Sequence, residues 1–198
     1  DSITTGNRND IVIGGTGNDI IAAGNGNNIA LGDNARLTAD RQDQDAQALF
    51  AVHAFTLARI ETFGFADAES GNDTVRAGDG NDLLFGGGAS DTVFAGSGND
   101  LVFGDQGLVE RRNNAPFDPT DPTTLPPQRW DLFPAGDARN GRIEFVATNT
   151  GVNTGSGNDL IYGQDGMDFL MGQQGQDTVY GGNGDDVLIG GSNVAGAL

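Results

Sequence analysis

Aspartate recurs at a spacing of nine residues through most of this chain. Written in lines of nine, the sequence has aspartate at the sixth position of every line but one, where Asn28 stands. These aspartates are Asp1, Asp10, Asp19, Asp73, Asp82, Asp91, Asp100, Asp159, Asp168, Asp177 and Asp186. Carboxylates at a fixed spacing are suited to holding a hard divalent cation, which takes oxygen ligands. The register also argues against a flexible acidic linker, which needs no fixed spacing.

The composition limits the kinds of cation and partner. The 198 residues carry 28 acidic and 10 basic side chains, a formal net charge of −18, with no cysteine and one histidine, His53. Thiolate sites are excluded and structural zinc is disfavoured. Nucleic acid is excluded as a partner, because its binders neutralise phosphates with Lys and Arg. Oxygen ligands in flexible loops favour calcium over magnesium, which demands a tight octahedral shell.

The eighth position of each line predicts the elements that hold these aspartates. It carries a small or branched aliphatic residue, as at Val12, Ile21 and Val93. Three strand residues after six loop residues send the middle one inward and its neighbours outward. The 33 glycines allow the tight backbone of the loops. We therefore expect an all-β fold, a parallel β-roll (a right-handed β-solenoid) in which two lines form one flattened coil.

Stacking of such coils explains why the loops need a cation. Parallel strands lie about 4.8 Å apart, so aspartates of successive loops face each other. Two unit charges about 5 Å apart repel by roughly 3 kcal/mol at an effective dielectric of 20. One buried residue per line makes too thin a core to offset this repulsion along two edges. A divalent cation between stacked loops turns the repulsion into attraction, so folding and calcium binding are expected to be one event.

The lines resemble the RTX (repeats-in-toxin) family, whose nonapeptide GGxGxDxUx is matched by segments such as 14–22 and 181–189. In that family the carboxylate at position six and the carbonyl groups at positions one and three hold calcium. The resemblance therefore implies several calcium ions. It implicates as ligands Asp10, Gly14, Thr16, Asp19, Asp73, Ala77, Asp79, Asp82, Gly86, Gly88, Asp91, Ala95, Ser97, Asp100, Ser156, Asp159, Gly163, Asp165, Asp168, Gly172, Gln174, Asp177, Gly181, Asn183 and Asp186. Asn28 departs from the pattern, so a weaker site is expected there, and line 68–76 lacks glycine at its first two positions.

Two insertions interrupt the repeats within what we expect to be a single domain, 1–198. The repeat blocks are 1–33, 68–107 and 154–191, and the insertions are 34–67 and 108–153. Each insertion follows a Gly-Asp pair and closes on Arg-Ile-Glu, at 59–61 and 142–144. We expect hairpin-like excursions whose closing strand rejoins the stack. The alanine-rich stretch 45–58 fits strand and helix equally well.

Alternate lines share an outer face of the expected roll. In the second block, one face presents Leu83, Phe85, Leu101 and Phe103, and the other presents Thr74, Arg76, Thr92 and Phe94. An apolar outer stripe needs a cover. Two interpretations remain open: the insertions fold back over the stripe, or it binds a surface partner or another copy of the chain.

The function expected from these features is that of a calcium-binding β-roll module in a secreted or cell-surface protein. The resemblance implies export through a type I secretion channel and folding in external calcium. No apolar run approaches the roughly 20 residues that span a bilayer, so no transmembrane segment is expected. The competing hypothesis is a self-assembling structural protein, such as an adhesin rod, a surface layer or an extracellular filament.

Catalysis and ice binding fit the sequence less well than calcium binding does. No nucleophile is paired with His53, and the repeat accounts for the acidic residues, so we expect no enzyme activity in this segment. RTX arrays accompany proteases, lipases and pore-forming toxins, so a catalytic domain elsewhere in a longer protein stays open. Ice binding would need a regular row of threonine, and the third position of the lines has only Thr16.

Overall fold

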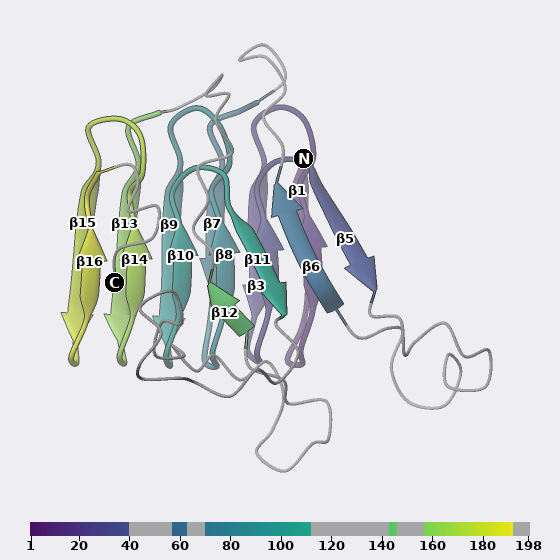
Figure 1. Cartoon of the computed structure of the whole chain (residues 1–198). Coiled ribbons are helices and arrows are strands. Elements are labelled where there is room, and N and C mark those ends of the chain that lie inside the picture. The colour runs from purple at the N-terminus through teal and green to yellow at the C-terminus, as the bar shows by residue number, and fades with distance from the viewer. Residues whose placement is uncertain (40–56, 63–69, 112–142, 146–156, 192–198) are drawn as a thin grey trace, which may run out of the picture.

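Short strands form two parallel sheets that lie face to face (Figure 1). The computed structural model describes residues 1–39, 57–62, 70–111, 143–145 and 157–191. Sheet A contains, in spatial order, β1 (Ser2–Thr4), β3 (Ile20–Gly24), β7 (Thr74–Ala77), β9 (Thr92–Ser97), β13 (Leu160–Asp165) and β15 (Thr178–Asn183). Sheet B contains β2 (Ile11–Ile13), β4 (Ile29–Leu31), β8 (Leu83–Phe85), β10 (Leu101–Phe103), β14 (Phe169–Met171) and β16 (Val187–Ile189).

The chain alternates between these sheets, so that two strands and two loops make one flattened coil. Neighbouring strands pair in parallel and keep the nonapeptide register, with Ile21 opposite Val75 and Val75 opposite Val93. The predicted all-β parallel roll is therefore confirmed. Within the described residues, no helix has the length and apolar character to cross a membrane.

Each of sheets A and B contributes a single layer of side chains to the core between them. The middle residue of each three-residue strand points inward, as alternation along a strand requires. Ile21, Val75, Val93 and Ile161 of sheet A meet Val12, Ala30, Leu84, Val102 and Leu170 of sheet B. All nine are at most 4% exposed. The interior is thus as thin as the nine-residue repeat predicts.

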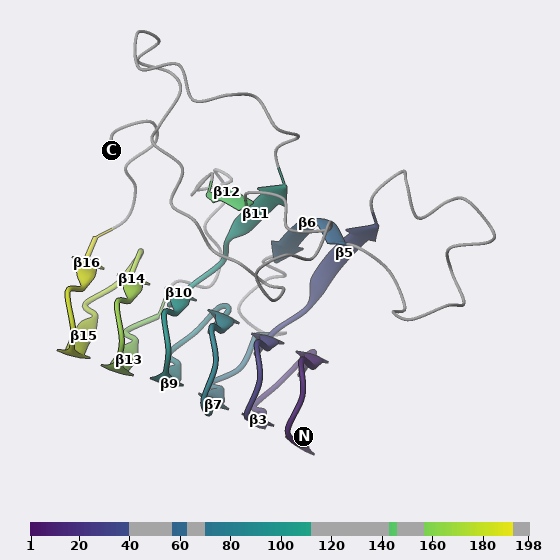
Figure 2. The same ribbon diagram turned by 90° about the horizontal axis from the view of Figure 1, so that it is seen from below.

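A third sheet covers the outer face of sheet B (Figure 2). Sheet C is antiparallel and contains, in spatial order, β12 (Ile143–Phe145), β11 (Leu108–Arg111), β6 (Leu57–Thr62) and β5 (Ala35–Ala39). Ile60 and Val109 of this sheet pack on a second core with Leu83, Phe85 and their neighbours on sheet B. The interpretation in which the insertions fold back over the apolar stripe is confirmed.

The prediction that the closing strands rejoin the stack is wrong. Segments 59–61 and 143–144 lie in β6 and β12, which pair with β11 in sheet C and not with the roll. The outward row of large apolar side chains on sheet B offers these strands a face to bury, whereas a strand returning to the roll would leave that face in water. Of the stretch 45–58, residues 57–58 belong to β6, and 45–56 lie outside the described residues.

The outer face of sheet A carries a row of stacked rings. Phe94 stacks on Tyr162, and Tyr162 on Tyr180, with ring centroids 5.0 Å apart in both pairs. The guanidinium of Arg76 lies 3.8 Å from the centroid of the Phe94 ring and so continues the row as a cation–π contact. Each of these residues is one coil from the next, so the row reinforces the parallel register.

We expect the core under sheet C to contribute more to stability than this row of rings. Phe103 is fully buried and stacks on Phe85 with centroids 4.7 Å apart, so Phe103→Ala should lower the free energy of unfolding by about 3–5 kcal/mol. Phe94→Ala, which deletes a partly exposed ring, should cost about 1 kcal/mol. Urea denaturation in saturating calcium measures both, and equal losses would contradict a core beneath sheet C.

Candidate metal sites

The loops of the roll stack into two edges. Edge A is defined as the loops that lead into sheet A, and their position-six residues are Asp1, Asp19, Asp73, Asp91, Asp159 and Asp177. Edge B is defined as the loops that lead into sheet B, with Asp10, Asn28, Asp82, Asp100, Asp168 and Asp186 at position six. The central members of both rows are at most 2% exposed. Parallel stacking thus turns one aspartate per line into two buried rows of carboxylates.

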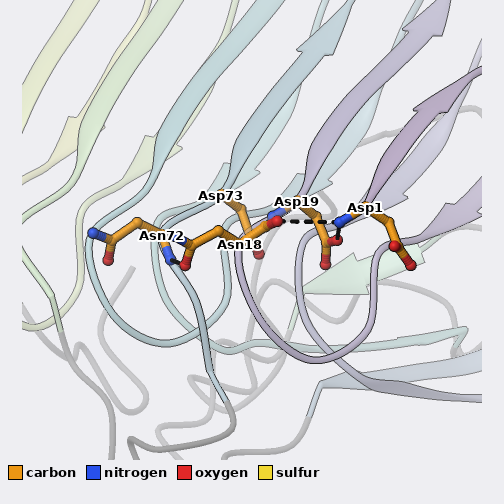
Figure 3. A network of polar contacts seen from close by, with 5 residues as sticks. All are labelled: Asp1, Asn18, Asp19, Asn72 and Asp73. Atoms are coloured by element: carbon orange, nitrogen blue, oxygen red, sulfur yellow. Dashed lines mark hydrogen bonds and ion pairs between the residues drawn. The ribbon is translucent and has the colours of Figure 1, made fainter.

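One oxygen of each buried carboxylate aligns two neighbouring loops. Asp73 Oδ1 accepts the backbone N–H of Asp19 at 2.8 Å, and Asp91 Oδ1 accepts that of Asp73 at 2.8 Å. Figure 3 shows the start of this row on edge A. The bond repeats farther along edge A at 2.9 and 3.0 Å, and along edge B at 2.7–3.1 Å. Position six therefore sets the register through hydrogen bonds as well as through charge.

The other oxygen of these carboxylates is buried without a hydrogen-bond partner. In the described part of the chain this holds for Oδ2 of Asp19, Asp73, Asp82, Asp91, Asp100, Asp159, Asp168 and Asp177. An ionised oxygen removed from water without a partner is strongly unfavourable. A calcium ion would satisfy it, since calcium accepts carboxylate and carbonyl oxygens in a flexible shell. The donor set therefore fits a row of calcium ions along each edge.

Burial shifts the acid–base behaviour of these carboxyls. It raises the pKa of Asp168 to about 6, of Asp73 and Asp82 to about 7, of Asp100 and Asp159 to about 8, and of Asp91 to about 10. The backbone N–H bonds oppose this rise in pKa, and neighbouring carboxylates add to it for most of the row. The metal-free edges thus favour protonated carboxyls, and a divalent cation would compete with those protons.

A second, neutral row runs beside the carboxylates. Asn18 at position five accepts the N–H of Asn72 through Oδ1 at 2.9 Å (Figure 3). Asn72 in turn accepts the N–H of Ser90 at 3.0 Å. Edge B has the same arrangement, in which Asn27 accepts the N–H of Asn81 and Asn81 accepts that of Asn99, both at 2.9 Å. These bonds are more exposed than the carboxylate row. They hold the loops in register without any charge.

On edge A, glycine at position one leaves room for the carboxylate of its own loop, whereas Ala23, Ala77 and Ala95 stand at position one on edge B. A Cβ atom built on Gly86 would lie 2.6 Å from Asp91 Oδ2 and would also collide with the carbonyl oxygen of Gly104 in the next coil. Any larger residue at this place would push the two loops apart. At position four, Gly98 has φ of 138°, which a residue with a Cβ rarely adopts.

Both insertions leave the roll inside an edge A loop and return to the same loop. Gly32 donates its N–H to Phe85, just as Gly14 does to Leu31, so Gly32 fills position one of the loop that ends at Asp73. Asp33 fills position two, and Ser70 resumes the loop at position three. Gly104 and Asp105 fill the same two places in the loop that ends at Asp159. The first carbonyl of line 68–76 is therefore replaced by that of Gly32, which sequence alignment in nines did not reveal.

Two buried carboxylates at these split loops were missing from the sequence-based ligand set. Asp33 is 3% exposed, and its Oδ2 accepts the N–H of Gly88 in the next coil at 2.6 Å. Asp105 is 7% exposed, and its Oδ2 accepts the N–H of Gln174 at 2.6 Å. Burial also raises the pKa of both carboxyls, to about 7 for Asp105. The Gly-Asp pair shared by the two insertion starts was the signal that could have identified them.

The structure brings the predicted position-six ligands together and places most position-three side chains outward. Asp79, Asp165 and Asn183 are exposed, and their carbonyl groups, with that of Ser97, each accept one N–H from a position-four glycine at 2.6–2.8 Å. A carbonyl oxygen has a second lone pair, so it can also bind a metal. Asp10 and Asp186 are partly exposed near the ends of edge B, and Ser156 lies outside the described residues.

Side chains alone do not complete a metal shell here. Among the described residues, no three carboxylate or imidazole groups converge on one point. Calcium takes six to eight oxygen ligands, so the carbonyl groups of the loops would have to supply the rest. Of the remaining predicted residues, the loops contain Gly14, Thr16, Gly86, Gly88, Gly172 and Gln174, and the C-terminal halves of β7, β9, β13 and β15 contain Ala77, Ala95, Gly163 and Gly181.

Comparison with known proteins agrees with this arrangement. The family model of the RTX calcium-binding nonapeptide repeat matches in four copies, at residues 1–34, 67–107, 152–179 and 162–193. Together these copies cover more than half of the chain. No curated protein and no solved structure gives a match.

Removal of the Asp33 carboxylate should destabilise the first split loop. Asp33→Ala leaves the buried N–H of Gly88 without an acceptor, so we expect the free energy of unfolding to fall by about 1–3 kcal/mol. Asp79→Ala removes an equal charge from an exposed position on edge B and should change it by less than about 0.5 kcal/mol. Urea denaturation in saturating calcium compares the two, and similar effects would contradict a role for Asp33 in holding the loop.

Without calcium, the roll should gain stability as the pH falls. In the folded state the pKa is about 6 for Asp168, about 7 for Asp73, about 8 for Asp100 and about 10 for Asp91, whereas the ordinary aspartate value is 3.8. Between these pKa values the folded state binds more protons than the unfolded chain. The free energy of unfolding therefore increases as the pH falls from about 8 toward 4, and it decreases again as the pH rises. Far-ultraviolet circular dichroism in calcium-free buffer measures this, and a strand signal that weakens on acidification would contradict it.

Proposed function

The chain belongs to the RTX calcium-binding nonapeptide repeat family, and from this premise we propose that it is a calcium-dependent structural module of a secreted or cell-surface protein. The observation that carries the proposal is the row of buried Oδ2 atoms that have no hydrogen-bond partner on either edge. Such a row is unfavourable in an ion-free protein and favourable around calcium. Its repetition in coil after coil makes cation binding a property of the whole roll.

The ligands in this proposal are the position-six carboxylates together with loop carbonyl groups. Asp19, Asp73 and Asp91 on edge A, and Asp82, Asp100 and Asp168 on edge B, are the most buried examples. Each has one oxygen engaged in aligning the loops and one available for the ion. This division lets the same side chain set the register and bind calcium.

Folding and calcium binding are coupled in this proposal. The chain has a net charge of −18, and the interior between sheets A and B is only one residue deep from each sheet. High charge with little apolar burial favours an expanded chain in the absence of ions. Extracellular calcium modules typically bind with a Kd of about 10⁻⁴–10⁻³ M, so the chain would stay loose in the cytosol and fold outside. Export through a type I secretion channel, which takes an unfolded chain, is consistent with that order.

The role proposed is structural, since the family's repeat is a calcium-binding structural unit. His53, the single histidine of the chain, lies outside the described residues. Self-assembly stays a prediction, with one observation in its favour. Leu188 pairs with the fully buried Leu170 and faces the same way, yet it is 44% exposed, because β16 has no partner strand on its other side among the described residues. A second copy stacked there would bury Leu188.

Addition of calcium should fold the chain in one cooperative transition. In a calcium-free buffer near pH 8 the far-ultraviolet circular dichroism should be that of a disordered chain, and millimolar calcium should produce a strand spectrum. Magnesium at the same concentration should fail, because it keeps its water and demands an octahedral shell. A strand signal that is present without calcium at this pH and unchanged on its addition would refute the coupling.

Two variants that remove the same charge test whether the calcium concentration at the folding midpoint depends on the position-six site. Asp91→Asn converts a buried carboxylate whose Oδ2 has no hydrogen-bond partner to an amide, so the calcium concentration at the folding midpoint should rise several-fold. Asp185→Asn removes the same charge from an exposed loop position and should leave the midpoint close to that of the unmodified protein. Equal shifts would mean that net charge, and not the site, controls folding.

A further inference from the structure

Asn28 differs from the other buried position-six residues in its second side-chain atom. Its Oδ1 accepts the N–H of Asp10 at 3.0 Å, as the aspartates of the row do for their neighbours. Its Nδ2, in the place of an Oδ2, donates to the carbonyl oxygens of Gly24 at 2.9 Å and Gly26 at 2.8 Å. Asn28 is fully buried and all of its side-chain polar atoms are satisfied within its own edge.

The orientation of this amide is determined by its surroundings. The backbone N–H of Asp10 needs an acceptor, and the carbonyl oxygens of Gly24 and Gly26 need donors. Rotating the amide by 180° would set a donor against a donor and an oxygen against two oxygens. The arrangement therefore has one stable form, and in it two N–H groups point at oxygens of the loop.

We propose that the two amide hydrogens of Asn28 replace a calcium ion, so that the loop 23–28 is a metal-free step within the calcium row of edge B. This inference rests on the proposed function, because it assumes that the aspartates of the row hold calcium. In an aspartate loop the partnerless Oδ2 needs a cation between itself and the loop oxygens. In the Asn28 loop the N–H groups already reach two such oxygens, and a cation brought there would be repelled by them.

The metal-free step still joins its neighbours in the stack. The N–H of Asn28 is donated to Asp82 Oδ1 at 2.7 Å, and Asn27 at position five accepts the N–H of Asn81. The hydrogen bonds between coils at this point are therefore the same as those elsewhere on edge B, and the proposed difference is confined to the ion.

Conversion of Asn28 to aspartate should create a calcium site. Asn28→Asp replaces the amide nitrogen with a second oxygen and restores the family pattern, so the number of calcium ions bound per chain at saturation should rise by one. Isothermal titration calorimetry, with equilibrium dialysis against radioactive calcium as a direct count, measures this number on the full chain. An unchanged number of ions in a folded Asn28→Asp protein would overturn the proposal.

The reciprocal variant separates this inference from the proposed function. Asp100→Asn, at a buried position on the same edge, should reduce the number of bound ions. If the unmodified chain binds no calcium, the proposed function fails. The inference about Asn28 fails alone under a different combination of results. In that combination the unmodified chain binds calcium and Asp100→Asn lowers the number of bound ions, but Asn28→Asp leaves that number unchanged.

A third variant tests the role of the amide in a protein that keeps its ions. Asn28→Ala removes both N–H groups without adding a ligand, so the ion count should stay unchanged while the melting temperature in saturating calcium falls. Asn28→Asp should instead retain its melting temperature in saturating calcium and lose more of it than the unmodified protein does when free calcium is lowered. A melting temperature of Asn28→Asp that depends on calcium concentration no more steeply than that of the unmodified protein would contradict the assigned role.

Discussion

The structure depends on carboxylates that must be buried for the coils to stack. Each position-six side chain, such as Asp73 or Asp91, uses one oxygen to receive the N–H of its neighbour and leaves the other without a partner in a dry interior. The strand register and the glycines beside the edge A carboxylates both follow from this arrangement. A hydrophobic interior of one residue per strand cannot offset such desolvation. The proposed function therefore makes cation binding part of the fold rather than an addition to it.

The two insertions show how a solenoid can bury a second apolar face without disturbing its stack. Both leave after position two of an edge A loop, and the strands they contribute meet in sheet C over Phe85 and Phe103. The cut falls within a loop of the proposed calcium row. Asp33 and Asp105 stand at the cut and accept N–H groups from the following coil. The carboxylates at the departure points thus hold the broken loops in the register of the intact ones.

A single heavy atom separates the two ways in which a loop of this roll satisfies its oxygens. In Asp82 the second side-chain atom is a partnerless oxygen, and in Asn28 it is a nitrogen bonded to two carbonyl groups. The first arrangement requires a cation and the second excludes one. A repeat can therefore vary its metal dependence coil by coil while its backbone and register stay the same, because the N–H bond to the neighbouring loop uses the other atom in both cases.

The sequence by itself determined the roll, its register and the position-six rows, because a nine-residue period couples one aspartate to one inward aliphatic residue such as Ile21 or Val93. These relations are local and repeated, so they can be recognised without knowing which distant segments are in contact. Only the tertiary structure decided that β6 and β12 leave the stack for sheet C, that Gly32 and Asp33 complete the loop of Asp73, and that the Asn28 amide is satisfied internally. Each of these depends on segments far apart in the chain or on the direction of a single side chain. Periodicity carries no information about either, since the free energy that selects them comes from burial and hydrogen bonding in the folded molecule.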